Sequence, residues 1–266
     1  MNIVNSDTPT SDPIKWLIYG NSGAGKTWSL KTLPASMRPV LIIDCDRKSK
    51  AVQSEEGFTI VQPDFIGSAG QPVLFTEVWS FCKALLDESI DLPFPCADYR
   101  TIVLDSYTIV HNAILNETLT NQLTQAGKDG RPKRDTIDDP PNLPEYGIIG
   151  HKATPLLQRF IQLLRNLIFV CHETQTMKDE VTGISQGGPA LQRSIATTFP
   201  RYFDELLYAR VIGQGTSRRW TWATQASGMF EARTSYPELA PEIDQDFGVY
   251  DSAIEIKEIA ASSILT

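Results

Sequence analysis

The sequence lacks the long apolar segments and the leader that mark membrane-spanning and secreted proteins. No apolar run in its 266 residues approaches the roughly 20 residues that cross a bilayer. The N-terminal stretch MNIVNSDTPTSDP is polar and has neither the basic nor the apolar region of a secretory signal. We therefore expect a cytoplasmic protein with no membrane partner.

Cysteine is scarce, and its positions exclude two kinds of small scaffold. The four cysteines are dispersed and form no CxxC motif; they are Cys45, Cys82, Cys96 and Cys171. This spacing argues against a zinc site and against a disulfide framework, and it indicates reduced, mostly buried thiols.

Positive charge is in the minority. With 24 lysines and arginines against 32 acidic residues, the formal net charge is −8. This balance excludes a uniformly basic coat for nucleic acid, but it allows a local basic patch, because phosphate binding depends on the local field. Hydrophobic residues make up 41% of the chain, which is typical of a globular protein and excludes a wholly disordered one.

Short apolar runs alternate with amphipathic segments along much of the chain. Four apolar runs are typical of buried strands: residues 15–20, 40–46, 100–106 and 167–173. Four segments have a helical pattern: residues 25–33, 73–88, 107–126 and 151–166. Strands that are apolar on both faces and separated by helices indicate a parallel sheet covered by helices.

The last third of the chain has a different pattern. A helix is predicted over 189–197, followed by short strands over 204–213, 218–224 and 229–235. These strands indicate an antiparallel extension at one edge of the sheet.

We find no internal repeat and no linker with globular sequence on both sides. We therefore expect one α/β domain over residues 13–250. A flexible tail precedes it at 1–12, and a tail that can form a helix follows it at 251–266.

The strongest motif lies between the first predicted strand and the first predicted helix. It matches G-x-x-x-x-G-K-[ST] in full with Gly20, Asn21, Ser22, Gly23, Ala24, Gly25, Lys26 and Thr27. The glycines allow backbone N–H groups to turn inward around an anion, and the positive end of the following helix favours phosphate. Lys26 would reach the terminal phosphates of ATP, and Thr27 would offer its hydroxyl to Mg²⁺.

A second metal anchor is predicted at the end of a buried strand. The run TIVLD ends in Asp105, which suits a contact to Mg²⁺ through water. The ordinary alternative is an aspartate that caps the next helix.

Five stretches together resemble RecA-core ATPases, and most closely the phage-encoded AAA/RecA-like nucleotide-binding proteins linked to single-strand annealing (the Sak type). The resemblance covers about residues 14–248. It is carried by GNSGAGKT, LIIDCD, TIVLDS, the segment 167–213 from the sensor strand to an edge strand, and the closing segment 229–248. It implies a RecA-like P-loop NTPase fold.

The resemblance also implies roles for residues at the ends of strands. Asp46 stands where RecA-type enzymes have the catalytic carboxylate that orients water, and Asp44 is the competing candidate. That residue is usually Glu, so the shorter Asp implies a closer water or slow hydrolysis. His172 stands where RecA has a sensor Gln for the γ-phosphate.

Related proteins act as oligomers, and the chain has no second domain to make a helicase motor. We therefore expect a homo-oligomer, either a ring or a filament. In such assemblies a cation from the neighbouring subunit reaches the γ-phosphate. The resemblance ranks Arg233 first for this role, with Arg218 and Arg219 as alternatives.

Two loops are candidates for binding single-stranded DNA. The first, residues 127–147, follows the helix after Asp105 and has Tyr146 as its only aromatic residue; the second is residues 174–188. Their basic side chains suit a phosphate backbone: Lys128, Arg131, Lys133, Arg134 and Lys178. The ordinary alternative is a solvated, charge-balanced loop.

The function expected from the resemblance is Mg²⁺-dependent ATP hydrolysis on single-stranded DNA, in phage recombination by strand annealing or in replication. The location would be the host cytoplasm, and a single-strand-binding protein is a candidate partner. A small-molecule or nucleotide kinase and a nucleotide-switched adaptor with little turnover remain as alternatives. The sequence leaves open whether the nucleotide is ATP or another triphosphate, and whether the polymer is DNA or RNA.

Overall fold

The computed structural model describes residues 13–87, 98–125, 127–131, 133–175 and 187–251. The predicted tail at 1–12 and nearly all of that at 251–266 lie outside the described residues, as does Lys178.

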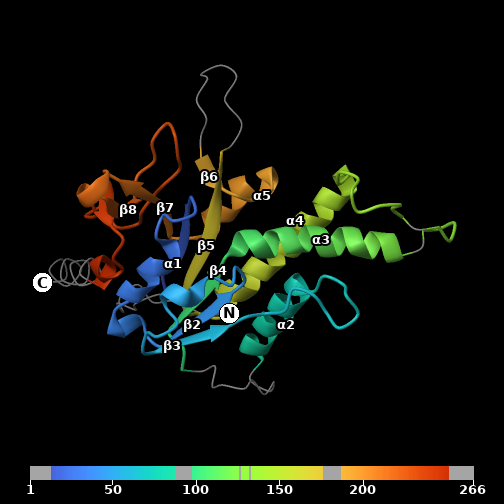
Figure 1. Cartoon of the computed structure of the whole chain (residues 1–266), viewed down its shortest axis with the longest axis horizontal. Coiled ribbons are helices and arrows are strands. Elements are labelled where there is room, and N and C mark those ends of the chain that lie inside the picture. The colour runs from blue at the N-terminus through green and yellow to red at the C-terminus, as the bar shows by residue number, and fades with distance from the viewer. Residues whose placement is uncertain (1–12, 88–97, 126, 132, 176–186, 252–266) are drawn as a thin grey trace, which may run out of the picture.

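A mixed sheet forms the centre of the molecule (Figure 1). The strand order is β3-β2-β4-β5-β1-β7-β8-β9, and β6 pairs with β5. The strands are β1 (Lys15–Gly20), β2 (Val40–Asp44), β3 (Phe58–Val61), β4 (Thr101–Asp105), β5 (Asn166–Gln175), β6 (Gly187–Pro189), β7 (Glu205–Ile212), β8 (Arg219–Ala223) and β9 (Glu242–Asp244).

Across the sheet, the neighbouring strands β3, β2, β4, β5, β1 and β7 run parallel to one another. Strands β6, β8 and β9 are antiparallel to their partners. This arrangement confirms the predicted α/β P-loop NTPase fold with an antiparallel edge. Parallel register places Gly20 beside His172, and Asp44 beside Asp105, at the carboxyl edge of the sheet.

Helices cover both faces of the sheet (Figure 1). The α-helices are α1 (Lys26–Ser29), α2 (Leu74–Leu86), α3 (Tyr107–Thr124), α4 (Leu143–Gln162) and α5 (Arg193–Thr198). Helix α1 continues as a 3-10 turn over Leu30–Thr32 and stops before Pro34, as proline dictates. Further 3-10 turns lie at Ala35–Met37, Ser49–Ala51, Phe199–Tyr202 and Gly215–Ser217.

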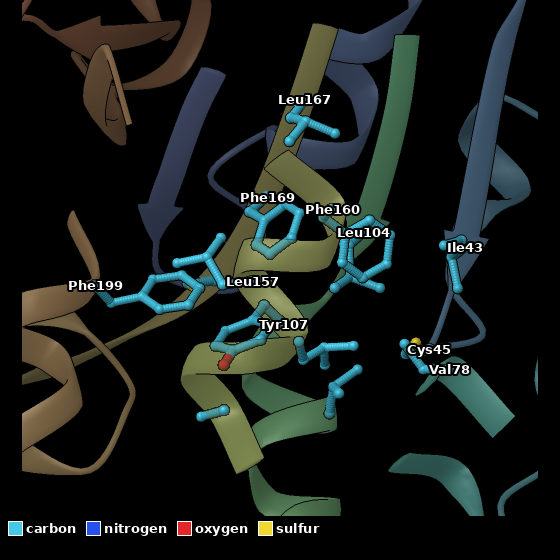
Figure 2. Close-up of a cluster of buried hydrophobic side chains, with 14 of the residues drawn as sticks. Ile43, Cys45, Val78, Leu104, Tyr107, Leu157, Phe160, Leu167, Phe169 and Phe199 are labelled. Carbon is cyan, nitrogen blue, oxygen red and sulfur yellow. The ribbon is translucent and has the colours of Figure 1, made fainter. Parts of the chain in front are cut away.

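Two apolar layers hold the sheet between the helices. One layer packs α2, α3, α4 and α5 against the sheet, with Tyr107 stacked on Phe199 at 4.3 Å between ring centres (Figure 2). The other lies beneath α1, where Trp16 meets the edges of the Phe247 and Tyr250 rings. The closing segment of the chain is therefore part of the core.

Three strands were not predicted, and one predicted strand is wrong. Strands β3, β6 and β9 are only three or four residues long, too short to show a pattern. The strand predicted over 229–235 makes only isolated bridges, including Leu206 with Arg233. Strand β8 already occupies the edge of β7 over 208–212, which leaves room for a single bridge at Leu206.

Helix α4 begins at Leu143, so the loop predicted over 127–147 is shorter than expected, and the predicted helix start at His151 is wrong. Asn142 accepts a hydrogen bond from the Glu145 N–H at 3.0 Å, and the Glu145 carboxylate accepts one from the Asn142 N–H at 2.8 Å. This reciprocal capping box starts the helix. Gly147 and Gly150 had obscured the helical pattern.

None of the helices in the described part of the chain combines the length and apolar character needed to cross a membrane.

Candidate active site

The phosphate loop joins β1 to α1 and has glycine where other residues would not fit. Gly25 has a φ of 88°, and a Cβ there would overlap the Gln245 side chain and lie 2.8 Å from Trp220 Cδ1. At Gly20, a Cβ would overlap the Ala209 carbonyl on β7. The neighbouring strands therefore impose glycine at these two positions.

Two side chains from the far end of the chain support this loop, and sequence reasoning missed both. Gln245 donates from Nε2 to the Ala24 carbonyl at 2.7 Å and to the Thr221 carbonyl at 3.1 Å. Trp220 donates from Nε1 to the Gly23 carbonyl at 3.3 Å. Nothing in the local sequence links these residues to a loop some 200 positions earlier.

Lys26 is buried at the base of the loop. Its Nζ donates to the Gly20 carbonyl at 2.7 Å and to the Asn21 carbonyl at 2.9 Å. Burial lowers the pKa of Lys26, although the negative charge of Asp105 opposes that shift. The ammonium group is thus held inside the phosphate loop.

Thr27 and Asp105 meet across the carboxyl edge of the sheet. Thr27 Oγ1 donates to Asp105 Oδ2 at 2.5 Å. Burial, with a smaller effect from nearby acidic groups, raises the pKa of Asp105 to about 6. Both groups are hard oxygen donors of the kind Mg²⁺ prefers, and a divalent cation would offset the cost of burying the carboxylate. The pair therefore fits the predicted Mg²⁺ position.

Asp46 and His172 form a pair beside the same cavity as Lys26. His172 Nε2 lies 3.0 Å from Asp46 Oδ2, and Lys48 Nζ lies 3.4 Å from the same oxygen. Partial burial would raise the pKa of Asp46, but the hydrogen bonds and charges of His172 and Lys48 outweigh it and lower the pKa. Asp46 is therefore ionised at neutral pH.

A cavity of about 500 Å³ joins these groups: Lys26, Thr27, Asp46, Asp105 and His172 all line it. Sequence reasoning had named all five. Lys26, Thr27, Asp46 and Asp105 end or follow β1, β2 and β4, whereas His172 lies within β5 beside Gly20, the last residue of β1. Parallel strands bring these positions to one edge of the sheet.

Asp44, the competitor of Asp46, has a different environment. Its carboxylate accepts hydrogen bonds from Lys48 N–H, from the Ser49 N–H and hydroxyl, and from the Gln62 amide at 2.6–3.2 Å. It is 1% exposed and does not line the cavity. The geometry therefore favours Asp46 as the residue that faces a nucleotide.

Two exposed tryptophans flank the same cavity. Trp28 is 53% exposed and Trp220 is 41% exposed, and both line it. Arg218 lies over the Trp220 ring, 4.9 Å from its centre. Aromatic faces beside a phosphate loop offer a stacking surface for a nucleobase.

The predicted DNA loop divides into two kinds of cation. Lys128, Arg131 and Lys133 are exposed, and Arg131 has a weak contact of 3.9 Å to Asp129. Arg134 is buried, 2.7 Å from Glu145, and also donates to the Asp139 carbonyl. Its assignment as a DNA-binding residue is therefore wrong, because its guanidinium group is buried and already paired with Glu145.

The three arginines proposed to act across a subunit boundary have different partners. Arg233 donates to the carbonyls of Pro200 at 2.5 Å and Phe203 at 2.7 Å. Arg219 pairs with Asp244 at 2.6 Å. Among the described residues, Arg218 has the Trp220 ring as its neighbour and no carboxylate partner.

Comparison with known proteins agrees with this site. A model of the AAA domain matches residues 12–236, which include the phosphate loop, Asp46, Asp105 and His172. No curated protein matches the chain. The match spans most of the sequence, so the chain belongs to the AAA domain family and is a nucleotide-binding P-loop ATPase.

Proposed function

We propose that the protein is a Mg²⁺-dependent ATPase that acts on single-stranded DNA, in recombination by strand annealing or in replication of a phage. The observation that carries the hydrolytic part is the Asp46–His172 pair, which lines the same cavity as Lys26. A carboxylate, a hydrogen-bonding partner for it and a phosphate-binding lysine are the groups that hydrolysis of a terminal phosphate requires.

Each residue has a distinct role in this proposal. Lys26 neutralises charge on the phosphates, and ionised Asp46 orients and deprotonates the attacking water. His172 holds the Asp46 carboxylate through the 3.0 Å contact and lies close enough to the cavity to respond to the γ-phosphate. Thr27 and Asp105 would hold Mg²⁺, which would supply positive charge beside the phosphates.

Two alternatives lose support from the contacts of particular residues. A kinase needs an arginine-bearing lid; in the segment that resembles one, Arg134 is locked against Glu145, which leaves Arg131 as the exposed arginine. An adaptor without turnover needs no oriented carboxylate, whereas Asp46 is ionised and held by a hydrogen-bonding partner.

Support for single-stranded DNA comes from the loop between α3 and α4. Lys128, Arg131 and Lys133 remain exposed there. Three phosphate contacts would contribute about 2 to the log–log salt slope at roughly 0.7 per contact.

Steady-state ATP hydrolysis tests the proposal, measured with Mg²⁺ and with or without a single-stranded oligonucleotide. We expect hydrolysis that the oligonucleotide accelerates. Lys26→Ala should abolish it, while Lys31→Ala, which removes a partly exposed lysine paired with Glu55, should leave it unchanged.

The other outcomes each point to a different function. Unchanged turnover in Lys26→Ala overturns the ATPase assignment, and turnover that ignores the oligonucleotide overturns the DNA part. Phosphate transfer to a small acceptor would favour a kinase. Tight ATP binding without turnover would favour an adaptor.

A further inference from the structure

A second cavity lies apart from the nucleotide site. It has a volume of about 930 Å³ and shares no lining residue with the nucleotide cavity. The first turns of α3 and α4 and the segment before and within α5 form its walls. Thr174 and Leu143 are among its lining residues; Thr174 is the first residue of the second predicted DNA loop, and Leu143 begins α4 after the exposed cations of the first. The cavity is therefore at the base of both loops.

Its inner wall has an unpaired donor and an unpaired acceptor. His111 is 5% exposed and accepts at Nε2 from the Gln192 N–H at 3.0 Å. Burial lowers the pKa of His111 to about 4, so the neutral ring has its proton on Nδ1. Among the described residues, His111 Nδ1 and Gln192 Oε1 have no hydrogen-bond partner. Unpaired buried polar atoms are costly, and a ligand that supplies partners to both would be favoured.

The rest of the wall is uncharged and combines apolar side chains with hydroxyl groups and the amide of Asn112. Leu115, Ile149 and Leu191 line it, together with the half-exposed ring of Tyr146. No charged side chain is among the described residues that line the cavity. The occupant should therefore be an uncharged, flat group with polar atoms along its edge.

We propose that this cavity accepts an unstacked base of the single strand, which stacks on Tyr146 and turns its polar edge toward His111 and Gln192. The inference rests on the proposed action on single-stranded DNA. A base combines a stacking face with adjacent donors and acceptors, whereas an apolar protein side chain would leave both polar atoms unpaired. The unpaired oxygen of Gln192 is shielded from solvent, so the proposal requires its side chain to rotate for the amide to reach the base.

The position also suits a polymer. The exposed cations Lys128, Arg131 and Lys133 lie on the loop that leads into α4, so phosphates can follow the loop while one base enters the cavity. Single-strand binding proteins combine these two elements, a basic track and aromatic stacking.

Binding of two strands of equal length tests the inference: an oligothymidine and an oligomer of abasic sites, both with the whole chain, ATP and Mg²⁺. We expect the wild-type protein to bind oligothymidine about five- to a hundredfold more tightly, the range of one base stacked on an aromatic ring. Tyr146→Ala should remove most of this preference and leave affinity for the abasic strand unchanged.

Two variants control for general damage. Tyr146→Phe should keep the preference, because the ring is retained. Tyr202→Ala should also keep it: Tyr202 is 37% exposed, against 38% for Tyr146, and does not line the cavity.

The remaining outcomes overturn the inference in distinguishable ways. Equal wild-type affinity for the two strands, or a Tyr146→Ala variant that weakens both equally or neither, overturns the base pocket but leaves action on DNA intact. In that case the cavity suits a side chain of a partner protein. Failure of the wild-type protein to bind either strand overturns the action on DNA as well.

Discussion

At the residue scale, Asp46 and Asp44 can be separated by experiment. Asp46→Asn should keep nucleotide affinity and lower the rate of hydrolysis about 10²–10⁴-fold, because it removes the general base. Asp44→Asn places an amide NH₂ among four donors and should destabilise the protein by about 1–3 kcal/mol. Single-turnover hydrolysis and urea denaturation measure the two effects. The assignment fails if Asp44→Asn alone loses turnover while remaining fully folded.

Asp105 is expected to lower the stability of the metal-free protein at neutral pH, although it is needed to bind the metal ion. Its pKa is raised from 3.8 to about 6, so the folded state favours the neutral acid. The associated stability is present below about pH 4 and is lost as the pH rises through 6, a cost of about 3 kcal/mol at neutral pH. Asp105→Asn should therefore stabilise the nucleotide-free protein by up to that amount at pH 7 and abolish Mg²⁺-dependent hydrolysis.

Urea denaturation of Asp105→Asn and the wild type at pH 7 and at pH 4 measures this effect. The difference in unfolding free energy should vanish at the lower pH, where the wild-type carboxyl is already neutral. A variant that is less stable than the wild type at pH 7 would show that the ionised Asp105 carboxylate gains more from its hydrogen bond with Thr27 than it loses through burial.

Most of the residues around the nucleotide cavity could be named from the sequence, because they follow buried strands or lie in a known motif. Gln245 and Trp220 could not, since their contacts with the phosphate loop arise only when distant strands pair. Arg134 was misassigned for a related reason. A run of basic residues in the sequence does not show which of them forms an ion pair with a buried glutamate.

At the scale of elements, Arg134 anchors the start of α4. Arg134→Met would leave Glu145 buried without its partner, 4% exposed, and should cost about 3–5 kcal/mol. The matched change Arg131→Met, at an exposed position, should alter stability by no more than about 0.5 kcal/mol. Chemical denaturation compares the two variants. Equal stability would mean that the capping box of Asn142 holds the helix without the ion pair.

The strongly periodic elements were predicted well, and the short ones were not. Strands β1, β2, β4 and β5 carry continuous apolar runs because both their faces are buried. Strands β3, β6 and β9 form only because a partner edge is free beside them. Such pairings depend on the rest of the sheet and leave no pattern in three or four residues.

At the scale of the whole molecule, the parallel sheet explains why five residues scattered from position 26 to position 172 share one cavity. Four of them end or follow a strand, His172 lies within β5 beside the last residue of β1, and these strands point the same way. The cavity opens beside exposed Trp28 and Trp220, so a neighbouring subunit could approach the phosphates from this side. If the protein forms the expected homo-oligomer, the question is which cation of the neighbouring subunit reaches the phosphates.

Mixing two inactive variants tests a site shared between subunits. Lys26→Ala lacks a working phosphate loop, and an arginine variant lacks the cation that the neighbour needs. Loss of such an arginine costs about 10³–10⁵-fold in other phosphoryl-transfer systems. If Arg233 acts in trans, Lys26→Ala mixed with Arg233→Ala should regain activity, because some interfaces combine an intact loop with an intact arginine.

Arg218 is the informative comparison for that mixture. Arg233 is held by two carbonyls of its own chain, so Arg233→Ala should also lower stability, which denaturation detects. Arg218 lies over the exposed ring of Trp220 without a carboxylate partner among the described residues, so Arg218→Ala should fold normally. Recovery with Arg218→Ala but not with Arg233→Ala would transfer the role to Arg218. If neither mixture recovers, and turnover per subunit stays constant as protein concentration rises, each subunit hydrolyses ATP without its neighbour.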